Sequence, residues 1–467
     1  MDNETYRRWA HTAADWSANY LDGVGNRPVR PNIRPGEISG QIPVTPPEVG
    51  EDMAQIMADL DRIIMPGMTH WQHPRFFAYF PANSSPPSVL AEQITAAIGA
   101  QCMLWQTSPA ATELETVMLD WLRQMIGLPD GFHGVIQDSA SSATLAAILT
   151  GREKALGFTG NRRGLASGPA VRVYCSAQAH SSIDKAIWIS GIGDDNLVRI
   201  ATDAQNRMQA DVLARQIERD LEAGHKPAVV IGTIGSTSIG ACDSLGALGK
   251  VAQAHDLYFH VDAAWAGSAL ICPEFRDAIQ GIETVDSFVF NPHKWLFTNF
   301  DCSAHFVRDP AALVRTLGIH PEYLKTHGER GINYSEWSVP LGRRFRALKL
   351  WFVIRGYGVE ALRTMVRQHC LWARELADEI GRHPDFELTT EPSFSLFSFR
   401  YAPRGRDDLD QLNSRLLQDI NTDGRIYLTQ TLHEGRFVIR FVVGQLHTTR
   451  EDVQLAWRVI QDLARAV

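Results

Sequence analysis

The chain has 467 residues, and its composition, 45% hydrophobic and 21% charged, is that of an ordinary globular protein. A net charge of −8 argues against nucleic acid or an anionic membrane surface as the main partner. The polar start predicts no signal peptide, and no apolar run reaches the roughly 20 residues that a bilayer requires. Six scattered cysteines without a C-x-x-C pair indicate buried thiols in a cytoplasmic protein, not a zinc site or disulfides.

The N-terminal part is expected to alternate between helical and extended segments. Residues 1–20 carry aromatic and small apolar side chains at helical spacing, which predicts an amphipathic helix. A proline-rich stretch over residues 28–47 cannot be a helix and predicts an extended connector. A second helix is expected over residues 51–64, before Pro66.

The middle of the chain alternates short apolar runs with helical patterns, which favours a largely parallel α/β sheet. Strands are expected at residues 171–175, 228–233, 257–261 and 286–290, and helices between them at 211–223 and 244–254. The last hundred residues predict a smaller α+β domain, with apolar runs at 394–400 and 437–443 and helices at 407–420 and 450–466.

Lys294 follows the predicted strand at residues 286–290. Desolvation there would lower its pKa and free the amine to attack a carbonyl, although a lone lysine is usually an exposed surface residue. Asp262 ends another predicted strand, 32 residues earlier, and the small Ala263 and Ala264 leave room for a flat ring. A fixed carboxylate keeps the ring nitrogen of pyridoxal phosphate protonated, whereas Asp262 alone would be read as a helix N-cap.

Two further segments fit the same cofactor. A short strand before residue 138 leads into Ser139, Ala140 and Ser141, where free N–H groups at a helix start would bind a phosphate. A serine-rich N-cap is common by itself. His180 follows the strand at residues 171–175 and could stack on the ring or lie near a substrate carboxylate, although a lone histidine is more often structural.

Together these motifs resemble the aromatic-L-amino-acid decarboxylase family, the pyridoxal-phosphate decarboxylases of the aspartate-aminotransferase fold (fold type I). The likeness covers nearly the whole chain and includes residues 73–81, 108–115, 272–276, 299–303 and 340–346. The resemblance implies a mostly parallel central sheet in a large cofactor domain over residues 76–355. It implies an N-terminal helical arm over residues 1–75 and a small C-terminal α+β domain over residues 356–467. It further implies pyridoxal 5′-phosphate as cofactor, no metal, and a homodimer with a shared active site, in which the N-terminal helix covers the partner.

The resemblance assigns roles to matching residues. Lys294 matches the lysine that binds the cofactor covalently, Asp262 the partner of the pyridine nitrogen, and His180 the ring-stacking histidine. His293 matches the histidine beside the lysine, and Tyr323 a loop tyrosine thought to protonate the carbanion. Cofactor contacts are also expected from Ala140, Ser141, Ser236, Ala264 and Asn291.

Substrate contacts are expected from the aromatic residues Trp71, Tyr79, Phe80 and Trp105, from Pro81 and Ala82, from His180 and from Gly342. Some of these aromatics could equally be core residues. Ala82 stands where some family members have a hydroxyl that meets the substrate. Gly342 lies where plant relatives carry glycine in indole-type enzymes, which leaves room for a bicyclic ring.

The predicted reaction is therefore decarboxylation of an aromatic L-amino acid. Tryptophan is favoured over phenylalanine, tyrosine and their hydroxylated forms. Four alternatives stay open: an aromatic aldehyde synthase, an aminotransferase whose carboxylate clamp Arg440 could resemble, a cofactor-free binding protein, and a metal hydrolase built on His180, His260 and Asp262.

Overall fold

The computed structural model describes residues 1–166, 168–319 and 331–466, which form two compact units. Unit 1 comprises Met1–Pro81, Trp372–Glu391 and Phe397–Val467, and unit 2 comprises Ala82–Leu371 and Pro392–Leu396. The expected three-part division at residues 75/76 and 355/356 stays a prediction. None of the helices in the described ranges combines the length and the apolar character needed to cross a membrane.

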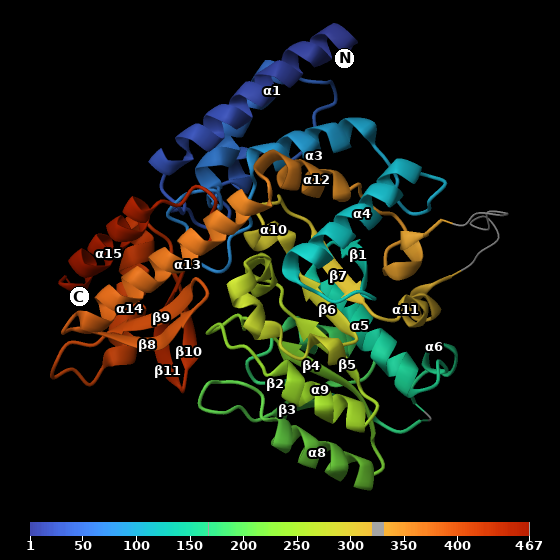
Figure 1. The fold of residues 1–467 in the computed structure, drawn as a ribbon. Coiled ribbons are helices and arrows are strands. Elements are labelled where there is room, and N and C mark those ends of the chain that lie inside the picture. Colours follow the sequence, from blue (N-terminus) through green and yellow to red (C-terminus); the bar gives the residue numbers. More distant parts are fainter. Residues whose placement is uncertain (167, 320–330, 467) are drawn as a thin grey trace. The chain divides into compact units, whose positions relative to one another are not determined.

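Unit 2 is built on a seven-stranded sheet with the order β1-β7-β6-β5-β4-β2-β3 (Figure 1). Strands β2 to β6 run parallel, and β7 runs antiparallel to both of its neighbours, β6 and β1. The four strands expected in the middle of the chain are present, and β3 and β7 are additions that the sequence patterns did not indicate. The bounds are β1 (His133–Gln137), β2 (Val171–Ser176), β3 (Leu197–Ile200), β4 (Lys226–Thr233), β5 (Tyr258–Asp262), β6 (Ser287–Phe290) and β7 (Ser303–Val307).

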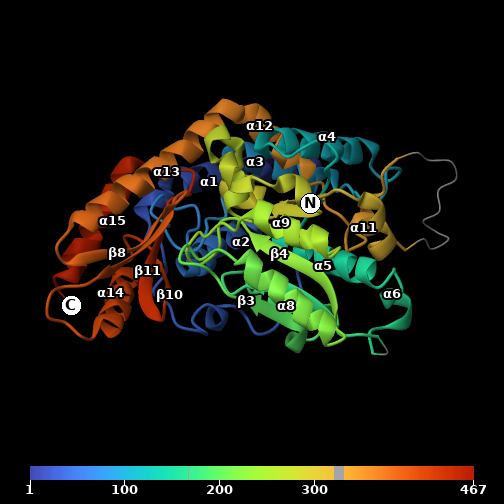
Figure 2. The ribbon, with the colours of Figure 1, turned by 60° about the horizontal axis from the view of Figure 1, so that its bottom comes forward.

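Helices cover both faces of this sheet (Figure 2). On one face α5 approaches β5 so closely that a Cβ on Gly151 would lie 2.8 Å from the Cβ of Tyr258. On the other face a Cβ on Gly232 would meet Phe259 and Leu248, the latter in α9. Because successive strand residues face opposite sides, Tyr258 and Phe259 place α5 and α9 on opposite faces.

The helices of unit 2 are α3 (Pro86–Ile98), α4 (Pro109–Ile126), α5 (Ala140–Ala155), α6 (Gly160–Arg163), α7 (Ser182–Ile189), α8 (Ala210–Glu222), α9 (Leu245–Ala254), α10 (Pro292–Trp295), α11 (Pro310–Leu317) and α12 (Ala347–Tyr357). Helix α13 (Val359–Arg382) begins in unit 2 and ends in unit 1. Short 3₁₀ helices occupy much of residues 266–284, after β5.

Unit 1 contains a four-stranded sheet with the order β10-β11-β9-β8, and α14 and α15 pack with it around one hydrophobic core. This is the α+β part expected near the C-terminus. Its elements are β8 (Phe386–Ser393), β9 (Leu396–Tyr401), α14 (Leu409–Asp423), β10 (Thr429–His433), β11 (Arg436–Val442) and α15 (Arg450–Ala464).

The N-terminal helices also lie in unit 1. Helix α1 (Asn3–Gly23) matches the amphipathic helix expected over residues 1–20. The helix expected over residues 51–64 begins after Asp52, whose carboxylate caps it, as α2 (Met53–Asp59). It then widens into one π turn at Leu60–Ile64.

Candidate active site

The predicted cofactor residues of unit 2 follow the carboxyl ends of five strands. Because β7 is antiparallel to both β1 and β6, β1 runs in the same direction as the parallel strands, and these five ends meet at one edge of the sheet. Ligands of open α/β sheets bind beyond this edge. After β1 comes Ser139, after β2 His180, after β4 Ser236, at the end of β5 Asp262, and after β6 Lys294.

Lys294 lies in the short helix α10 and is partly buried. Its N–H donates to the carbonyl oxygen of Asn291 at 2.9 Å, and its own carbonyl accepts a hydrogen bond from Asn83 Nδ2 at 2.5 Å. These two bonds fix the backbone that carries the amine. A buried strand followed by a tight turn therefore places the lysine at the sheet edge, as the sequence predicted.

Asp262 and Lys294 both lie within electrostatic reach of His180. Asp262 is buried, and its Oδ1 accepts the N–H of Ala264 at 2.9 Å. His180 is exposed at the surface, yet enough protein surrounds the ring that desolvation lowers its pKa; the charge of Asp262 opposes this shift and that of Lys294 adds to it. Since such effects weaken with distance, the three groups form one cluster.

The tautomer of His180 is set by its neighbour in the turn before α7. Nδ1 accepts the N–H of Ser182 at 3.1 Å and lies 2.8 Å from the Ser182 hydroxyl. An accepting Nδ1 cannot carry a proton, so the neutral ring carries its proton on Nε2.

The start of α5 has the features of an anion-binding site. Ser139 is the N-cap: its Oγ accepts the N–H of Ser142 at 3.2 Å and its carbonyl accepts that of Ala143 at 3.1 Å. The N–H groups of Ala140 and Ser141 come before these bonds and have no partner within the helix. Such a helix start attracts phosphate by its N–H groups and its dipole.

Asn291, Ala264 and Ser236 surround the same edge. The Asn291 N–H donates to the carbonyl of Ala264 at 2.9 Å, and Ser303 Oγ donates to Asn291 Oδ1 at 2.5 Å, which orients the amide. Ser236 is buried, and its hydroxyl accepts the Ala241 N–H at 3.0 Å, so the hydroxyl hydrogen stays able to donate.

A buried polar chain on the same strand as Asp262 was missed by sequence reasoning. His260 Nε2 lies 3.2 Å from Thr144 Oγ1 and its Nδ1 lies 2.9 Å from Ser287 Oγ, which in turn is 2.8 Å from His305 Nε2. Both ring nitrogens of His260 are therefore occupied. The metal hydrolase built on His180, His260 and Asp262 loses a ligand, because His260 has no lone pair left to give.

In unit 1 the predicted substrate residues fall into two groups. Trp71 and Tyr79 are 37% and 48% exposed, and their rings stack at 5.8 Å. Tyr79 adopts a left-handed φ of +47°, a strained conformation for a bulky side chain, and its OH lies 3.4 Å from that of Tyr427. Phe80 and Pro81, by contrast, are buried.

Arg440, the residue that could resemble an aminotransferase clamp, is also in unit 1. It is buried, its Nη1 donates to Thr429 Oγ1 at 3.0 Å, and its guanidinium lies 5.3 Å from the ring centroid of Phe80. Burial lowers its pKa to about 10, so it stays charged near neutral pH. These contacts with a threonine hydroxyl and an aromatic ring are typical of a packed structural arginine.

The remaining predicted substrate residues lie in unit 2. Tyr323, the predicted proton donor, lies outside the described residues. Ala82 is partly buried, and Trp105 donates its Nε1–H to Glu113 Oε1 at 3.0 Å, at the surface. Gly342 is exposed, and a Cβ built on it would lie 3.2 Å from Gln101 Nε2. The amide of Gln101 is held in place, because its Oε1 accepts the N–H of the next residue, Arg343, at 2.7 Å.

Comparison with known proteins gives strong matches. A model of the pyridoxal-dependent decarboxylase conserved domain matches residues 35–402. The aromatic-L-amino-acid decarboxylase of Rattus norvegicus is 42% identical over 487 residues, which cover 100% of this chain and 99% of the relative. A phenylacetaldehyde synthase of Arabidopsis thaliana is 40% identical over 99% of this chain and 96% of its own length. Among solved structures, Oryza sativa TDC with PLP and tryptamine has a TM-score of 0.96 at 36% identity and covers 100% of this chain and 99% of its own.

We expect His293 to make the protein sensitive to acid. Its Nδ1 accepts the Cys302 N–H at 2.8 Å, and burial followed by the charge of Lys294 lowers its pKa to about 3. The folded state therefore binds fewer protons than the unfolded state between pH 3 and 6.5, so stability falls as pH drops through this window. At pH 5 the loss of stability is about 2 kcal/mol.

His293→Gln keeps an acceptor for Cys302 but cannot be protonated. It should remove this loss when the free energy of unfolding in urea is compared at pH 7.5 and 5.0. His11→Gln, at an exposed histidine, is the control and should change nothing. An equal loss in both variants would contradict the assignment.

Proposed function

Because the chain belongs to the pyridoxal-dependent decarboxylase family, we propose that it decarboxylates an aromatic L-amino acid, with tryptophan as the favoured substrate, and releases the arylalkylamine and CO₂. The predicted family, fold type, cofactor and carboxy-lyase class are confirmed by this membership. The observation that carries the proposal is the cluster of Lys294, Asp262 and His180 at the strand ends of unit 2.

The residues at this edge fit pyridoxal 5′-phosphate. The N–H groups of Ala140 and Ser141 suit its phosphate. The buried carboxylate of Asp262 suits a cationic donor such as a protonated ring nitrogen, because a buried charge needs a partner. Ala264 packs against a small apolar cluster of Ala140, Ala143 and Val289, so small apolar side chains lie beside the start of α5.

When bound, the cofactor supplies an electron sink for the pair that the departing carboxylate leaves behind. Lys294 would hold the cofactor covalently and be displaced by the substrate amine. Asp262 would keep the proton on the ring nitrogen, and His180 would lie over the ring. Tyr323 would return a proton to the substrate Cα. His293 stays neutral, so it acts by holding the Cys302 turn and not by its charge.

An aromatic substrate is supported by the names of the relatives, which include a tryptophan decarboxylase of Oryza sativa. The relative named phenylacetaldehyde synthase keeps the aldehyde synthase as the second candidate. Such an enzyme consumes O₂ and forms an aldehyde in place of the amine.

A product assay on the full chain with its cofactor tests both candidates. We expect CO₂ and amine in equal amounts from tryptophan, without a keto-acid acceptor, and little aldehyde or hydrogen peroxide. Lys294→Ala should lose the cofactor's visible absorbance and reduce the rate of CO₂ release by a factor of at least about 10³, since it removes the group that binds covalently. Aldehyde as the main product, or undiminished CO₂ release by Lys294→Ala, would contradict the proposal.

Gly342 provides a test of the substrate. Gly342→Ser adds a side chain whose Cβ lies 3.2 Å from the fixed amide of Gln101. The serine side chain must therefore extend to the side of Gly342 that faces away from Gln101. We expect kcat/KM for tryptophan to fall about tenfold or more relative to that for phenylalanine, the usual range for small changes of pocket volume. Gly381→Ser, an exposed helical position with nothing within 4 Å of its Cβ, is the matched control. An unchanged ratio of the two kcat/KM values would separate Gly342 from substrate choice.

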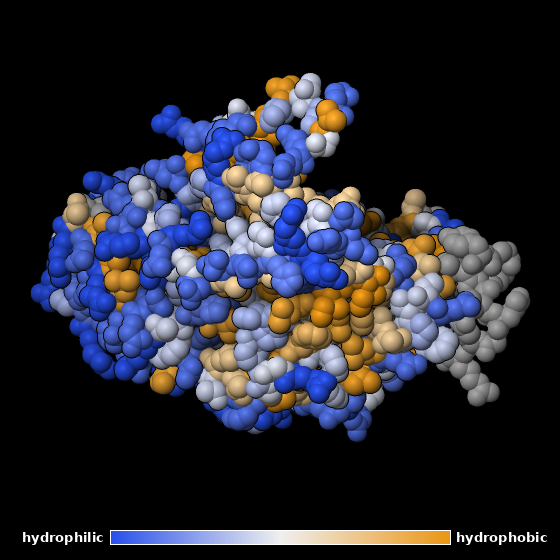
Figure 3. All heavy atoms as spheres, turned by 90° about the horizontal axis from the view of Figure 1, so that it is seen from above, coloured by the Kyte–Doolittle hydropathy of each residue, from blue (hydrophilic) through white to orange (hydrophobic). Residues whose placement is uncertain are grey.

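We also propose that the chain forms a homodimer. Helix α3 exposes a stripe of three large apolar side chains at helical spacing, Leu90, Ile94 and Ile98, which are 55%, 43% and 57% exposed. Figure 3 shows one face of the molecule on which hydrophobic residues gather. Helix α1 has no buried residue along its 21 residues, as suits an arm that packs on a partner. Contiguous exposed apolar surface of this kind marks interfaces.

The dimer is tested by sedimentation velocity. Ile94→Asp places a charge in the middle of the stripe, and the variant should sediment as a monomer at a concentration where the unchanged chain sediments as a dimer. Leu221→Asp changes a similarly exposed residue of α8 and should leave the dimer intact. A monomeric unchanged chain would refute the dimer, and a dimeric Ile94→Asp would move the interface elsewhere.

A further inference from the structure

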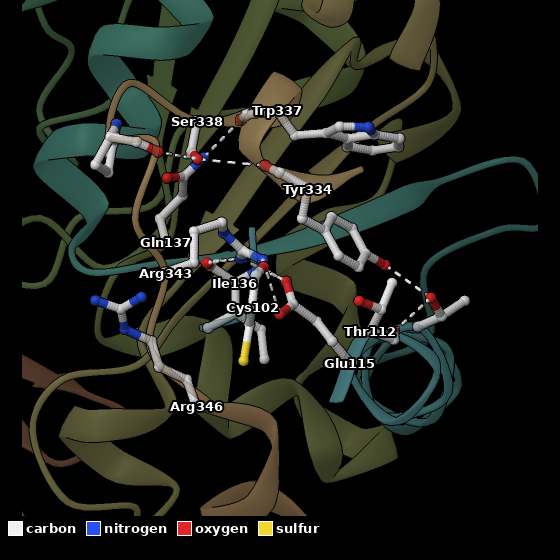
Figure 4. A network of polar contacts seen from close by, with 12 residues as sticks. Cys102, Thr112, Glu115, Ile136, Gln137, Tyr334, Trp337, Ser338, Arg343 and Arg346 are labelled. Atoms are coloured by element: carbon white, nitrogen blue, oxygen red, sulfur yellow. Dashed lines mark hydrogen bonds and ion pairs between the residues drawn. The ribbon is translucent and has the colours of Figure 1, made fainter. Parts of the chain in front are cut away.

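A buried ion pair joins helix α4 to the segment before α12. Glu115 and Arg343 are only 2% and 4% exposed, and the contact is bidentate, with Arg343 Nη2 at 2.7 Å from Glu115 Oε1 and Nη1 at 3.1 Å from Oε2 (Figure 4). The guanidinium also lies 5.0 Å from the ring centroid of Tyr334. Desolvation offsets much of the attraction in a buried pair, so its contribution lies in the geometry that it imposes.

The pair holds the backbone of Ile136 in β1. The Ile136 N–H donates to Glu115 Oε1 at 2.9 Å, and the Ile136 carbonyl accepts from Arg343 Nη2 at 2.7 Å. Strand β1 is the last in the sheet order, so one side of it has no neighbouring strand. The carboxylate supplies the acceptor and the guanidinium the donor that a further strand would have offered.

Ile136 stands directly before the phosphate turn. Gln137 ends β1, its Nε2 donates to the carbonyl of Trp337 at 3.0 Å, and Ser139 then caps α5. A shift of β1 at Ile136 is therefore passed through the three residues that follow it to the N–H group of Ala140. The dihedral angles along this short path are restrained, because Gln137 is bonded to Trp337 and Ser139 to the first turn of α5.

We infer that Glu115 and Arg343 are positioning residues for the cofactor phosphate: by clamping Ile136 they fix the direction of the N–H groups at the start of α5. The inference rests on the proposed placement of the phosphate at Ala140 and Ser141. The protein loses affinity for the phosphate when the N–H groups that bind it are displaced, although neither Glu115 nor Arg343 touches the phosphate.

The test compares pyridoxal 5′-phosphate with pyridoxal, which lacks the phosphate, as ligands of the full chain stripped of cofactor. Absorbance titration gives both Kd values, and thermal unfolding gives Tm. Glu115→Gln and Arg343→Lys should raise the Kd for pyridoxal 5′-phosphate by about tenfold to hundredfold, the value of one hydrogen bond to a charged group. The Kd for pyridoxal should not change. A merely structural role would weaken both ligands alike.

Glu153→Gln is the matched control. Glu153 forms a pair with Arg152 that is equally buried, 1% and 7% exposed, but lies near the other end of α5. Its Tm should fall as in Glu115→Gln, with the ratio of the two Kd values unchanged. The inference is overturned if Glu115→Gln and Arg343→Lys leave the ratio of Kd for pyridoxal 5′-phosphate to Kd for pyridoxal unchanged, or if Glu153→Gln raises it equally.

Ala140→Pro separates the inference from the proposal beneath it, because it removes the N–H of Ala140 at the first position of α5, where proline is tolerated. If it selectively weakens pyridoxal 5′-phosphate and Glu115→Gln does not, the phosphate lies at the start of α5 and only the positioning role fails. If Ala140→Pro has no phosphate-specific effect, the proposed phosphate placement fails and the inference falls with it.

Discussion

Strand β7 runs against both of its neighbours, and this reversal brings the carboxyl end of β1 to the edge where β2, β4, β5 and β6 also end. With β1 reversed, the start of α5 would lie at the opposite edge, roughly 17 Å away for a five-residue strand. The helix start that suits a phosphate and the carboxylate that suits a pyridinium would then be separated by the sheet. One pairing direction thus decides whether the site can form.

Backbone contacts also decide how the histidines at this edge behave. His180 and His293 each accept a backbone N–H on Nδ1, from Ser182 and Cys302. Both rings therefore keep the proton on Nε2 and hold one orientation. Burial lowers the pKa of both, so a change of pH near neutrality leaves this arrangement in place.

Much of the large sheet and of the candidate site could be predicted from the sequence, because the patterns that indicate them lie within single short segments. Lys294 and Asp262 each end or follow an apolar run that is short enough to be only a strand, and the structure has β6 and β5 there. Strand β7 was not indicated, because its sequence includes a serine and a histidine, and its antiparallel direction is a property of the sheet and not of its residues. The roles of Lys294 and Asp262 in binding and catalysis stay predictions.

The pair of Glu115 and Arg343 shows where sequence reasoning stops. The two residues are 228 positions apart, and each alone reads as a surface charge, because ionised side chains are rarely buried. The chain from Thr144 through His260 to His305 was missed for the same reason, since its members belong to separate elements. Only the packing of α4 and α5 on the sheet brings such groups together.

The closing of β1 by side chains has a consequence for the molecule in a crowded solution. An outer strand with free N–H and carbonyl groups is a template on which another chain can add a strand, and so a starting point for aggregation. At Ile136 both groups are already engaged by Glu115 and Arg343. The sheet thus ends at β1 without a polypeptide neighbour, and the same two side chains deny a foreign strand its hydrogen bonds there.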